Sequence, residues 1–533
     1  MRFISLALAA AISAGTTAAQ LPADFNRGMI VLNEGQFGKL SGTMTFIPTE
    51  GGADNIVYTA VRQVNPEKSL GLTSCFAQVY GNHIYVMSKQ AWNKEDRIGG
   101  RFTALNATSL EVKASIETLP NGDGRGFCAV SEEKAYVGGS KGLYVLNLAD
   151  MTFSDTQLAP ANDKGTVQQT GDIIRYGSRV FASQQNIGVV VIDIATDEVE
   201  RVIELPKIAG FALLADGTLY AATSDAEAEF VKIDPLTLDT EVINIEGSHA
   251  IDSPWATWRS AAICADKTEP VVYYLSGAGF SPKKISSYNF ATGEFNGEFF
   301  LLTPEMTGLS DKAMLYGQGL SIDPLSGNLM LNVNISYTDE SYLLAVDPAT
   351  GSLLSDLTVT LEPDYWFSSM MVYPDFTAPE FSLTDVELAE GDTFEFNIYD
   401  ATTLPVGNSH LILYGLPEVD NTDVATLAEG EDGSYTLTAV APGTAQVTFS
   451  ADYKGRTGVC TFSVTVPEPE QGGDDGDDDE NKDEDKDGIS QVTVDSLDAS
   501  MSLYDLQGRQ VTNPAPGLYL CRRGSAVTKI LVK

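Results

Sequence analysis

The chain has few of the side chains that build metal centres and nucleophilic catalytic sites. Its 533 residues include five cysteines and three histidines. The cysteines are odd in number and far apart, at Cys75, Cys128, Cys264, Cys460 and Cys521. This spacing predicts neither a disulfide framework nor a zinc site, and the distant histidines leave little material for a Ser-His-Asp triad. We therefore expect no metal and no cofactor, and we interpret Cys75, Cys128 and Cys264 as small, buried apolar residues.

Long apolar runs and clusters of positive charge are also scarce. After the first 20 residues, no stretch approaches the ~20 apolar residues that a membrane-spanning helix needs. Lysine and arginine number 33 against 73 acidic residues, which gives a formal net charge of −40. Because phosphate binding needs concentrated positive charge, this balance argues against a nucleic-acid partner. We expect no transmembrane segment and no nucleic acid.

The first 19 residues have the pattern of a cleavable secretory signal. Arg2 precedes an apolar run over residues 3–12, and small residues at 17–19 precede Gln20. The apolar run is too short to span a bilayer. We therefore expect an exported protein, either at the cell surface or secreted, whose mature chain begins near Gln20.

Part of the negative charge is concentrated in one tract. Residues 468–487 hold twelve acidic residues and two lysines. Like charges at this density repel one another, so we interpret residues 467–488 as an extended, disordered linker. A D-x-D-x-D-G pattern that begins at Asp483 resembles a calcium loop. Val494 stands where a bidentate glutamate belongs, which favours weak, diffuse cation binding.

A hairpin that recurs six times organises the first two-thirds of the chain. In its best-preserved copy, residues 188–206, an apolar strand is followed by an Asp-x-x-Thr turn (Asp193 to Thr196) and a second strand. The other copies cover residues 101–116, 142–153, 229–243, 284–297 and 342–357. Another pair of strands around a tight turn precedes each copy. Each unit therefore has four antiparallel strands, here called a to d, in about 40 to 58 residues.

The two ends of this region fit together as one further unit. Residues 28–33, 42–48 and 55–61 supply strands b, c and d, and residues 368–373 supply strand a. Closing a ring in this way removes free strand edges. We predict an all-β protein in which a seven-bladed β-propeller (residues 24–376) is followed by an Ig-like β-sandwich (378–466). After the linker, residues 489–533 form a small C-terminal β-module.

Function is expected on one face of the propeller. Strands alternate in direction, so the b–c and d–a loops, which are the long ones, share a face. All four tryptophans fall in these loops, and a contiguous exposed apolar patch usually marks a binding site. We therefore expect a ligand site made of aromatic and polar loop residues. The candidates are Asn33, Gln36, Phe37, Lys89, Trp92, Asn93, Gln184, Gln185, Trp255, Trp258, Arg259, Phe280, Tyr337, Tyr365 and Trp366.

Two other interpretations of this face stay open. A single loop tryptophan is more often a plug that packs between blades. Alternatively, two of the carboxylates Glu34, Asp252, Glu340 and Asp364 could hydrolyse a glycoside if they lay about 5 to 9 Å apart. No phosphate loop or nucleophile elbow supports an enzyme. We expect a binding protein with no catalytic residues, and we keep a hydrolase or lyase as a distant alternative.

The repeated I-D-x-x-T strand pairs resemble the YncE-like surface propellers. The opening segment G-M-I-V-L-N-E-G-Q-F-G, residues 28–38, is similar to a subset from Bacteroidetes that includes the BtuG-type cobalamin-binding proteins. This resemblance implies a seven-bladed propeller on the outer surface. It also implies capture of a corrinoid such as cobalamin and its transfer to an outer-membrane TonB-dependent transporter.

Two further resemblances concern the rest of the chain. Residues 437–449 resemble the group 2 bacterial Ig-like domains, which are usually spacers or adhesive stalks. The Y-D-x-x-G-R core at residues 504–509 and the terminal K-I-L-V-K resemble the type A C-terminal sorting domain of the type IX secretion system. That resemblance implies export by this secretion machinery. We expect a surface or secreted propeller that captures a small molecule, with an adhesion or protein-interaction module as the alternative.

Overall fold

The computed structural model describes residues 21–468 and 490–532, with short gaps. The gaps are residues 23, 51–54, 95–97, 250, 252–254, 256–260, 278–281, 337–339, 362–367, 404–411, 431–432, 493–500, 505–509, 512–516 and 524–525. The predicted signal and almost all of the predicted linker lie outside the described residues. The chain divides into two compact units, Met1–Glu468 and Pro469–Lys533, which are described separately. None of the described helices is long and apolar enough to cross a membrane.

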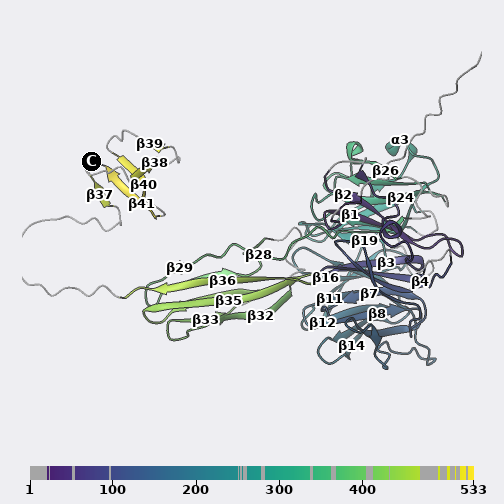
Figure 1. The fold of residues 1–533 in the computed structure, drawn as a ribbon, viewed down its shortest axis with the longest axis horizontal. Coiled ribbons are helices and arrows are strands. Elements are labelled where there is room, and N and C mark those ends of the chain that lie inside the picture. The colour runs from purple at the N-terminus through teal and green to yellow at the C-terminus, as the bar shows by residue number, and fades with distance from the viewer. Residues whose placement is uncertain are drawn as a thin grey trace, which may run out of the picture. The chain divides into compact units, whose positions relative to one another are not determined.

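Small antiparallel sheets of four strands make up much of the first unit (Figure 1). Five of the sheets in the described chain contain four strands that are neighbours in both sequence and space. The first and second of these sheets contain β3 (Leu72–Tyr80), β4 (His83–Gln90), β5 (Phe102–Asn106) and β6 (Val112–Ile116), and β7 (Gly124–Ala129), β8 (Lys134–Gly139), β9 (Gly142–Asn147) and β10 (Thr152–Phe153). The third and fourth contain β11 (Thr170–Tyr176), β12 (Arg179–Gln184), β13 (Gly188–Asp193) and β14 (Glu198–Glu204), and β15 (Ile208–Leu213), β16 (Leu219–Thr223), β17 (Glu229–Ile233) and β18 (Thr240–Asn244). The fifth contains β19 (Ile263–Ala265), β20 (Val271–Ser276), β21 (Lys284–Asn289) and β22 (Glu294–Leu301). This is the order that the repeat predicts.

A seven-stranded sheet joins the beginning of this region to its end. Its order is β2-β1-β27-β23-β24-β25-β26. The strands are β1 (Gly28–Asn33), β2 (Thr43–Pro48), β23 (Ala313–Ile322), β24 (Leu329–Ile335), β25 (Ser341–Val346), β26 (Val359–Leu361) and β27 (Ser368–Val372). Ile30 in β1 lies opposite Val372 in β27, so the predicted pairing of the two ends is present. A single parallel bridge between Gln318 and Met370 connects β27 to β23. The region is a β-propeller closed by its own termini.

The predicted strand over residues 55–61 is wrong. Val57 pairs with Phe46 in an isolated bridge, and helix α1 (Ala60–Val64) follows directly. Ala60 and Val61 are buried in the same cluster as Phe46. The apolar residues thus cover β2 as a helical turn and do not extend its sheet. Two other short helices, α3 (Pro304–Thr307) and the 3₁₀ helix η2 (Ser355–Leu357), lie in connections.

The Asp-x-x-Thr turns owe their shape to the aspartate side chain. The Asp193 carboxylate accepts the backbone N–H groups of Ala195 at 2.9 Å and Thr196 at 2.8 Å. Hydrogen bonds from Thr196 hold the pKa of Asp193 below its usual value. Asp234 accepts the N–H groups of Leu236 and Thr237 in the same way. The geometry that these two turns share serves the architecture of each sheet.

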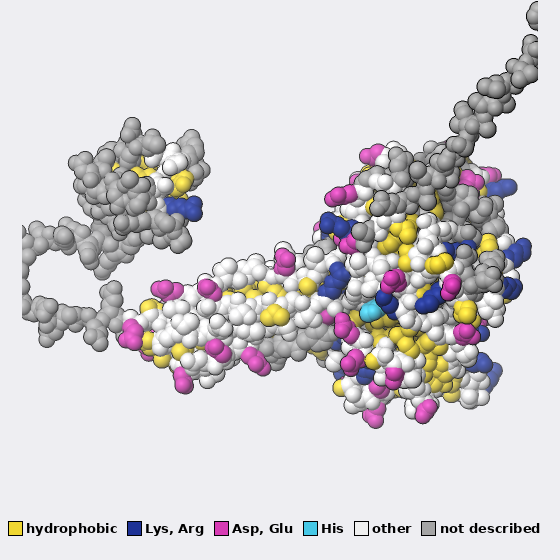
Figure 2. All heavy atoms as spheres, in the orientation of Figure 1, with side chains coloured by type: hydrophobic (Ala, Val, Ile, Leu, Met, Phe, Trp, Pro, Cys, Tyr) yellow, Lys and Arg dark blue, Asp and Glu magenta, His cyan; other side chains and the backbone are white. Residues whose placement is uncertain are grey.

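Hydrophobic side chains fill the space between neighbouring sheets of the propeller. In one such cluster, Phe181 and Val191 from the β11–β14 sheet pack with Leu219 and Ile233 from the β15–β18 sheet. Many of the acidic side chains are exposed. Figure 2 shows acidic groups scattered over both parts of the first unit on this face. On this face the negative charge of the described residues is therefore dispersed and does not form one acidic patch.

A β-sandwich follows the propeller in the same unit. One sheet has the order β29-β36-β35-β32, the other has the order β30-β34-β33, and β28 pairs with β31. The strands are β28 (Glu380–Phe381), β29 (Val386–Glu387), β30 (Thr393–Asn397), β31 (Thr402–Thr403), β32 (Ile412–Val419), β33 (Ala425–Glu429), β34 (Ser434–Ala439), β35 (Gly443–Tyr453) and β36 (Arg456–Val466). Phe449 and Phe462 of the first sheet share a buried core with Phe396 and Tyr435 of the second.

The tip of the β35–β36 hairpin packs against the propeller. Tyr453 is buried in the cluster that contains β1 and β2, and its ring meets Phe376 edge-on at 5.4 Å. The backbone N–H of Gly81 donates to the carbonyl of Lys454 at 2.6 Å. Arg456 donates to the carbonyl of Phe376 and lies 4.0 Å from its ring centroid. The hairpin tip is thus fixed to the turn that follows β3.

The second unit contains one small sheet. Its order is β37-β41-β40-β38-β39. The strands are β37 (Ser490–Val492), β38 (Met501–Tyr504), β39 (Gln510–Val511), β40 (Gly517–Arg523) and β41 (Ala526–Val532). Leu503, Cys521, Ile530 and Val532 form its buried cluster. The β-rich C-terminal module is present, whereas most of the Y-D-x-x-G-R core lies outside the described residues.

Burial of ionisable groups predicts a loss of stability at alkaline pH. Burial raises the pKa of the Cys128 thiol from 9.0 to about 12, and the nearby Arg175 opposes this shift only in part. Burial also raises the pKa of Tyr85 and of Tyr220 from 10.0 to about 12. The unfolded chain ionises first as pH rises, so this stability is complete below about pH 9 and declines from there towards pH 12.

We expect the thermal midpoint to fall above pH 9, and to fall less steeply in Cys128→Ala. Melting curves recorded from pH 7 to pH 11 check this expectation. Equal slopes in both proteins, or rapid reaction of Cys128 with a thiol reagent in the native protein, would contradict it.

Candidate functional site

The propeller surrounds a cavity of about 1440 Å³ on its central axis. Its walls come from the first strand of several sheets, namely β3, β7, β11, β15, β23 and β27. These strands are the innermost ones, because each begins its sheet at the axis. The cavity ends among the turns that connect strands a and b, such as Gly177–Ser178 and Asp216–Gly217, and one c–d turn at Pro235. Residues of the sandwich close part of this end.

The inner walls are mainly apolar, with several tyrosine rings. Phe76, Val79, Ile173, Leu213, Met370 and Val372 contribute apolar surface. Tyr80 in β3, Tyr176 in β11, Tyr373 just after β27 and Tyr399 between β30 and β31 add four rings. Tyr399 comes from the sandwich and lies against Gly433, where a Cβ would stand 2.5 Å from the ring. Apolar walls with a few polar groups are typical of sites for small molecules.

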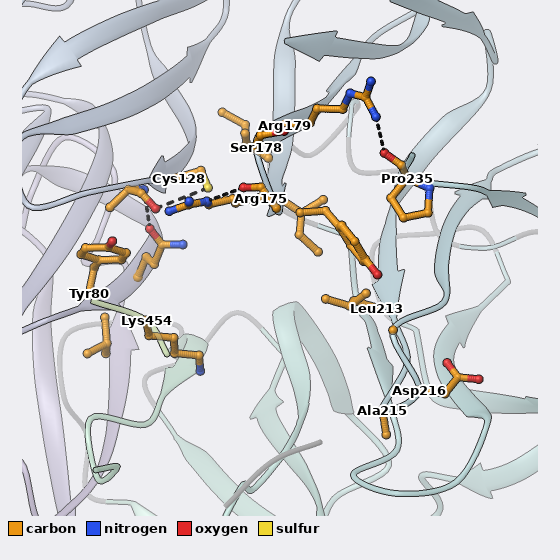
Figure 3. A pocket seen from close by; sticks show the side chains of 18 of the residues that line it. Tyr80, Cys128, Arg175, Ser178, Arg179, Leu213, Ala215, Asp216, Pro235 and Lys454 are labelled. Atoms are coloured by element: carbon orange, nitrogen blue, oxygen red, sulfur yellow. Dashed lines mark hydrogen bonds between the residues drawn. The ribbon is translucent and has the colours of Figure 1, made fainter. Parts of the chain in front are cut away.

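Two arginines in the wall are held by the protein itself. Arg175 donates to the carbonyl groups of Gly177 and Val130. Arg179 forms an ion pair with Glu200 at 2.6 Å and donates to the carbonyls of Pro235 and Leu236. Figure 3 shows the bond from Arg179 to Pro235 across the rim of the cavity. Both guanidinium groups therefore stabilise the turns whose carbonyl groups they bind.

A smaller cavity of about 270 Å³ adjoins the large one. Both are lined by Ile174, Leu213 and Ala215, so they share one wall. The smaller cavity is lined further by Phe211, Ile263 and Ile322, with Asp266 and Lys267 at its polar side. An apolar side pocket next to the channel enlarges the space for a ligand.

Four predicted ligand residues turn inwards. Trp92 is 3% exposed, and Lys94 lies 5.5 Å from its ring centroid. The Trp255 indole N–H donates to the carbonyl of Ile208 at 2.7 Å, and its ring packs on the cluster of Phe181 and Val191. Asn33 and Gln184 are buried and bond to Thr45 and to the Pro160 carbonyl. The expectation that Trp92 stands in an exposed patch is wrong, because the ring is packed inside the protein.

The other predicted ligand residues are half-buried, exposed or outside the described part. Phe37 is 69% exposed and Asn93 is exposed, whereas Gln36, Lys89 and Gln185 are half-buried. The remaining six lie outside the described residues: Trp258, Arg259, Phe280, Tyr337, Tyr365 and Trp366. Gln185 accepts a hydrogen bond from Gln169 at 3.0 Å. The role of these residues in ligand binding stays a prediction.

Of the four carboxylates in the alternative enzymatic interpretation, two are described. Glu34 is 4% exposed and accepts a hydrogen bond from the Tyr316 hydroxyl at 3.2 Å. Glu340 accepts one from Tyr342 at 2.6 Å, which raises the pKa of that tyrosine. No cluster of three or more metal-ligating side chains occurs among the described residues. The two described carboxylates thus accept hydrogen bonds from different tyrosines.

The residues that line the cavity were not predicted as a site. The cavity lies at the end of the a–b turns, opposite the face that carries the long loops. One signal was available in the sequence: the two-residue turn Lys454–Gly455 between long strands predicts an exposed hairpin tip. That the tip would cover the propeller axis depends on the docking of two folded parts, which local patterns do not encode.

Fold and cavity together define a β-propeller with a large, mostly apolar space on its axis. The chain belongs to the family described as "Domain of unknown function (DUF5074)", whose model matches residues 27–374. No curated protein matches the chain. Among solved structures, it is similar to a quinoprotein alcohol dehydrogenase-like protein from Bacteroides thetaiotaomicron, with 17% identity, a TM-score of 0.48, and coverage of 66% of this chain and 79% of that one.

Two other solved structures are similar over part of the chain. The computationally designed Ika8 protein has 10% identity and a TM-score of 0.38, with coverage of 78% of this chain and 97% of that one. The Dos1 propeller has 14% identity and a TM-score of 0.34, with coverage of 45% of this chain and 61% of that one.

Proposed function

We propose that this chain is an exported binding protein whose seven-bladed propeller holds a small molecule in the cavity on its axis. The count of seven treats β27-β1-β2 and β23–β26 as separate blades that meet at the Gln318–Met370 bridge. In this proposal the sandwich is an Ig-like domain, and residues 489–533 are a sorting domain. The chain carries out no catalytic step.

The size and lining of the cavity carry the proposal. Typical sites for small molecules enclose roughly 300 to 1,000 Å³, and the channel cavity measures about 1440 Å³. The space therefore suits a ligand larger than most metabolites. A corrinoid is our candidate, because its wide macrocycle presents apolar faces to rings such as Tyr80 and Tyr176, and because residues 28–38 resemble the opening of corrinoid-binding propellers.

Titration of the full-length chain with cyanocobalamin, followed by calorimetry and absorbance, tests this proposal. Ala215→Trp introduces a large ring at the wall that the two cavities share, and we expect affinity to fall by about ten-fold or more. Phe37→Ala removes an exposed aromatic residue from the loop face, and we expect affinity to stay within about two-fold.

If titration at micromolar protein gives no heat and no absorbance change, the corrinoid is eliminated as the ligand. If Phe37→Ala abolishes binding and Ala215→Trp has no effect, the ligand sits on the loop face as the tryptophan pattern predicts.

The proposal also includes a cellular location and partners. The protein would pass the outer membrane through the type IX machinery by means of residues 489–533 and would deliver its ligand to a TonB-dependent transporter. A chain that lacks residues 489–533 should stay inside the cell envelope, whereas the full chain should be cleaved by protease added to intact cells. Equal protection of both chains would contradict this location.

A further inference from the structure

One positive charge in the cavity lining makes no hydrogen bond or ion pair within the described chain. Lys454, at the tip of the β35–β36 hairpin, lines the cavity from the sandwich side. Its ammonium lies 5.2 Å from the Tyr453 ring centroid and 5.8 Å from that of Phe376. Within the described chain its Nζ makes no hydrogen bond or ion pair, in contrast to Arg175 and Arg179. In Figure 3 the Lys454 side chain extends into the open part of the cavity.

The backbone at Lys454 is unsuited to lysine. Tyr453 pairs with Arg456, so Lys454 and Gly455 form a two-residue turn, and their φ angles are 49° and 83°. Such turns favour asparagine or glycine at the first position, because a residue with a longer side chain is strained when φ is above zero. Turn geometry therefore does not explain a lysine here.

Hydrogen bonds around Lys454 hold the backbone of its turn in place. The Lys454 carbonyl accepts the Gly81 N–H at 2.6 Å, and the Asp452 carboxylate accepts the Gly455 N–H at 2.9 Å. The carboxylates of Asp216 and Asp234 in the wall accept backbone N–H groups of their own turns. Asp400 and Glu429 also line the cavity from the sandwich. The turn thus holds the Lys454 ammonium near the rings of Tyr453 and Phe376, in a cavity whose walls carry further tyrosines.

We propose that Lys454 binds an anionic group, such as a carboxylate, sulfonate or phosphodiester, on a ligand whose apolar ring lies against the tyrosine walls. This inference rests on the proposed use of the cavity as a binding site but not on the ligand being a corrinoid. It also gives the sandwich a direct part in ligand recognition, in addition to any role as a spacer. A charge-assisted hydrogen bond from the Lys454 ammonium group favours an anionic ligand over a neutral ligand of the same shape.

Two fluorescent probes separate the charge from the apolar contact. The first, 8-anilinonaphthalene-1-sulfonate, carries a sulfonate beside its rings, and the second, N-phenyl-1-naphthylamine, has similar rings and no charge. We expect both to bind the full-length protein. Lys454→Gln should weaken the sulfonate probe by about ten-fold and change the neutral probe by less than about two-fold. Lys454→Arg should keep most of the affinity for the sulfonate.

Two controls guard against a purely structural effect. Lys141→Gln removes an exposed charge outside the cavity and should leave both affinities unchanged. Lys454→Gly relieves the strained turn, so the thermal midpoint should rise while affinity for the sulfonate falls. Unchanged sulfonate binding in Lys454→Gln, a parallel loss of both probes, or no binding of either probe to the unmodified protein would each overturn the inference.

A second pair of ligands distinguishes this inference from the corrinoid proposal. Cyanocobalamin carries a phosphodiester in its nucleotide loop, whereas dicyanocobinamide lacks that loop. If the protein binds corrinoids, Lys454→Gln should weaken cyanocobalamin by about ten-fold and cobinamide by less than about two-fold. If the protein binds neither corrinoid, the proposed ligand fails, while the sulfonate measurement still decides the role of Lys454.

Discussion

Replacing Gly455 with alanine should release the sandwich from the propeller. Gly455 has a φ of 83°, and a Cβ there would stand 2.6 Å from the Gly81 nitrogen and 2.6 Å from the Tyr80 ring. The substitution adds the strain of a left-handed residue to a collision with backbone that cannot move away. We expect the free energy of docking to fall by about 3 kcal/mol, which lowers the docked population relative to the undocked one by roughly a hundred-fold.

The matched control is Gly391→Ala in the same sandwich. Gly391 has a φ of 87° and no atom within 4 Å of its ideal Cβ. This variant pays the backbone strain alone, so we expect a loss of about 1 kcal/mol in the stability of the sandwich and no change in docking. Limited proteolysis between Phe376 and Glu380 measures the undocked fraction in the full chain. Equal cleavage rates in the two variants would show that the hairpin tip does not hold the two parts together.

The repeat made the propeller predictable. In an Asp-x-x-Thr turn the aspartate side chain accepts hydrogen bonds from the turn's own backbone, as Asp193 accepts the N–H groups of Ala195 and Thr196. Such turns depend on neighbouring residues only, so the sequence marks them wherever they occur. The pairing of residues 28–33 with 368–372 follows from the same logic, because a strand set that lacks one member must find it elsewhere. The strand predicted at residues 55–61 failed, since a five-residue helix buries the same apolar side chains.

The location of the cavity depends on contacts that no local pattern records. Long, irregular loops suggested one face, but the sandwich covers the axis at the opposite one. That arrangement arises from a few residues far apart in sequence: Arg456 donates to the carbonyl of Phe376, and Gly81 donates to the carbonyl of Lys454. Both loop tryptophans in the described chain can be read from sequence as surface groups or as plugs. Whether each ring points into solvent or into the protein depends on the space left between the packed sheets, which the sequence around the tryptophan does not specify.

Trp255→Ala should therefore destabilise the propeller. Its indole packs on a cluster formed by the β11–β14 and β15–β18 sheets and donates to the Ile208 carbonyl at 2.7 Å. It also approaches Gly171 so closely that a Cβ there would stand 3.1 Å from the ring. Removing a large packed aromatic group leaves a void and an unpaired carbonyl. Because the side chain is only half-buried, we expect a loss of about 3 kcal/mol, at the lower end for such truncations.

A conservative variant separates the loss of ring packing from the loss of the hydrogen bond to Ile208. Trp255→Phe retains most of the ring and removes the N–H donor, so its loss should be about 1 kcal/mol. Urea unfolding of the full chain, followed by circular dichroism, compares the midpoints. The opposite result would be an unchanged midpoint in Trp255→Ala together with weaker ligand binding. In that case the ring would face a ligand, and the loop face would again be the site. Trp255 lies where β11 and β15 approach each other, and its ring fills the gap between two neighbouring sheets. We therefore expect Trp255→Ala to lower the stability of the propeller more than its affinity for a ligand.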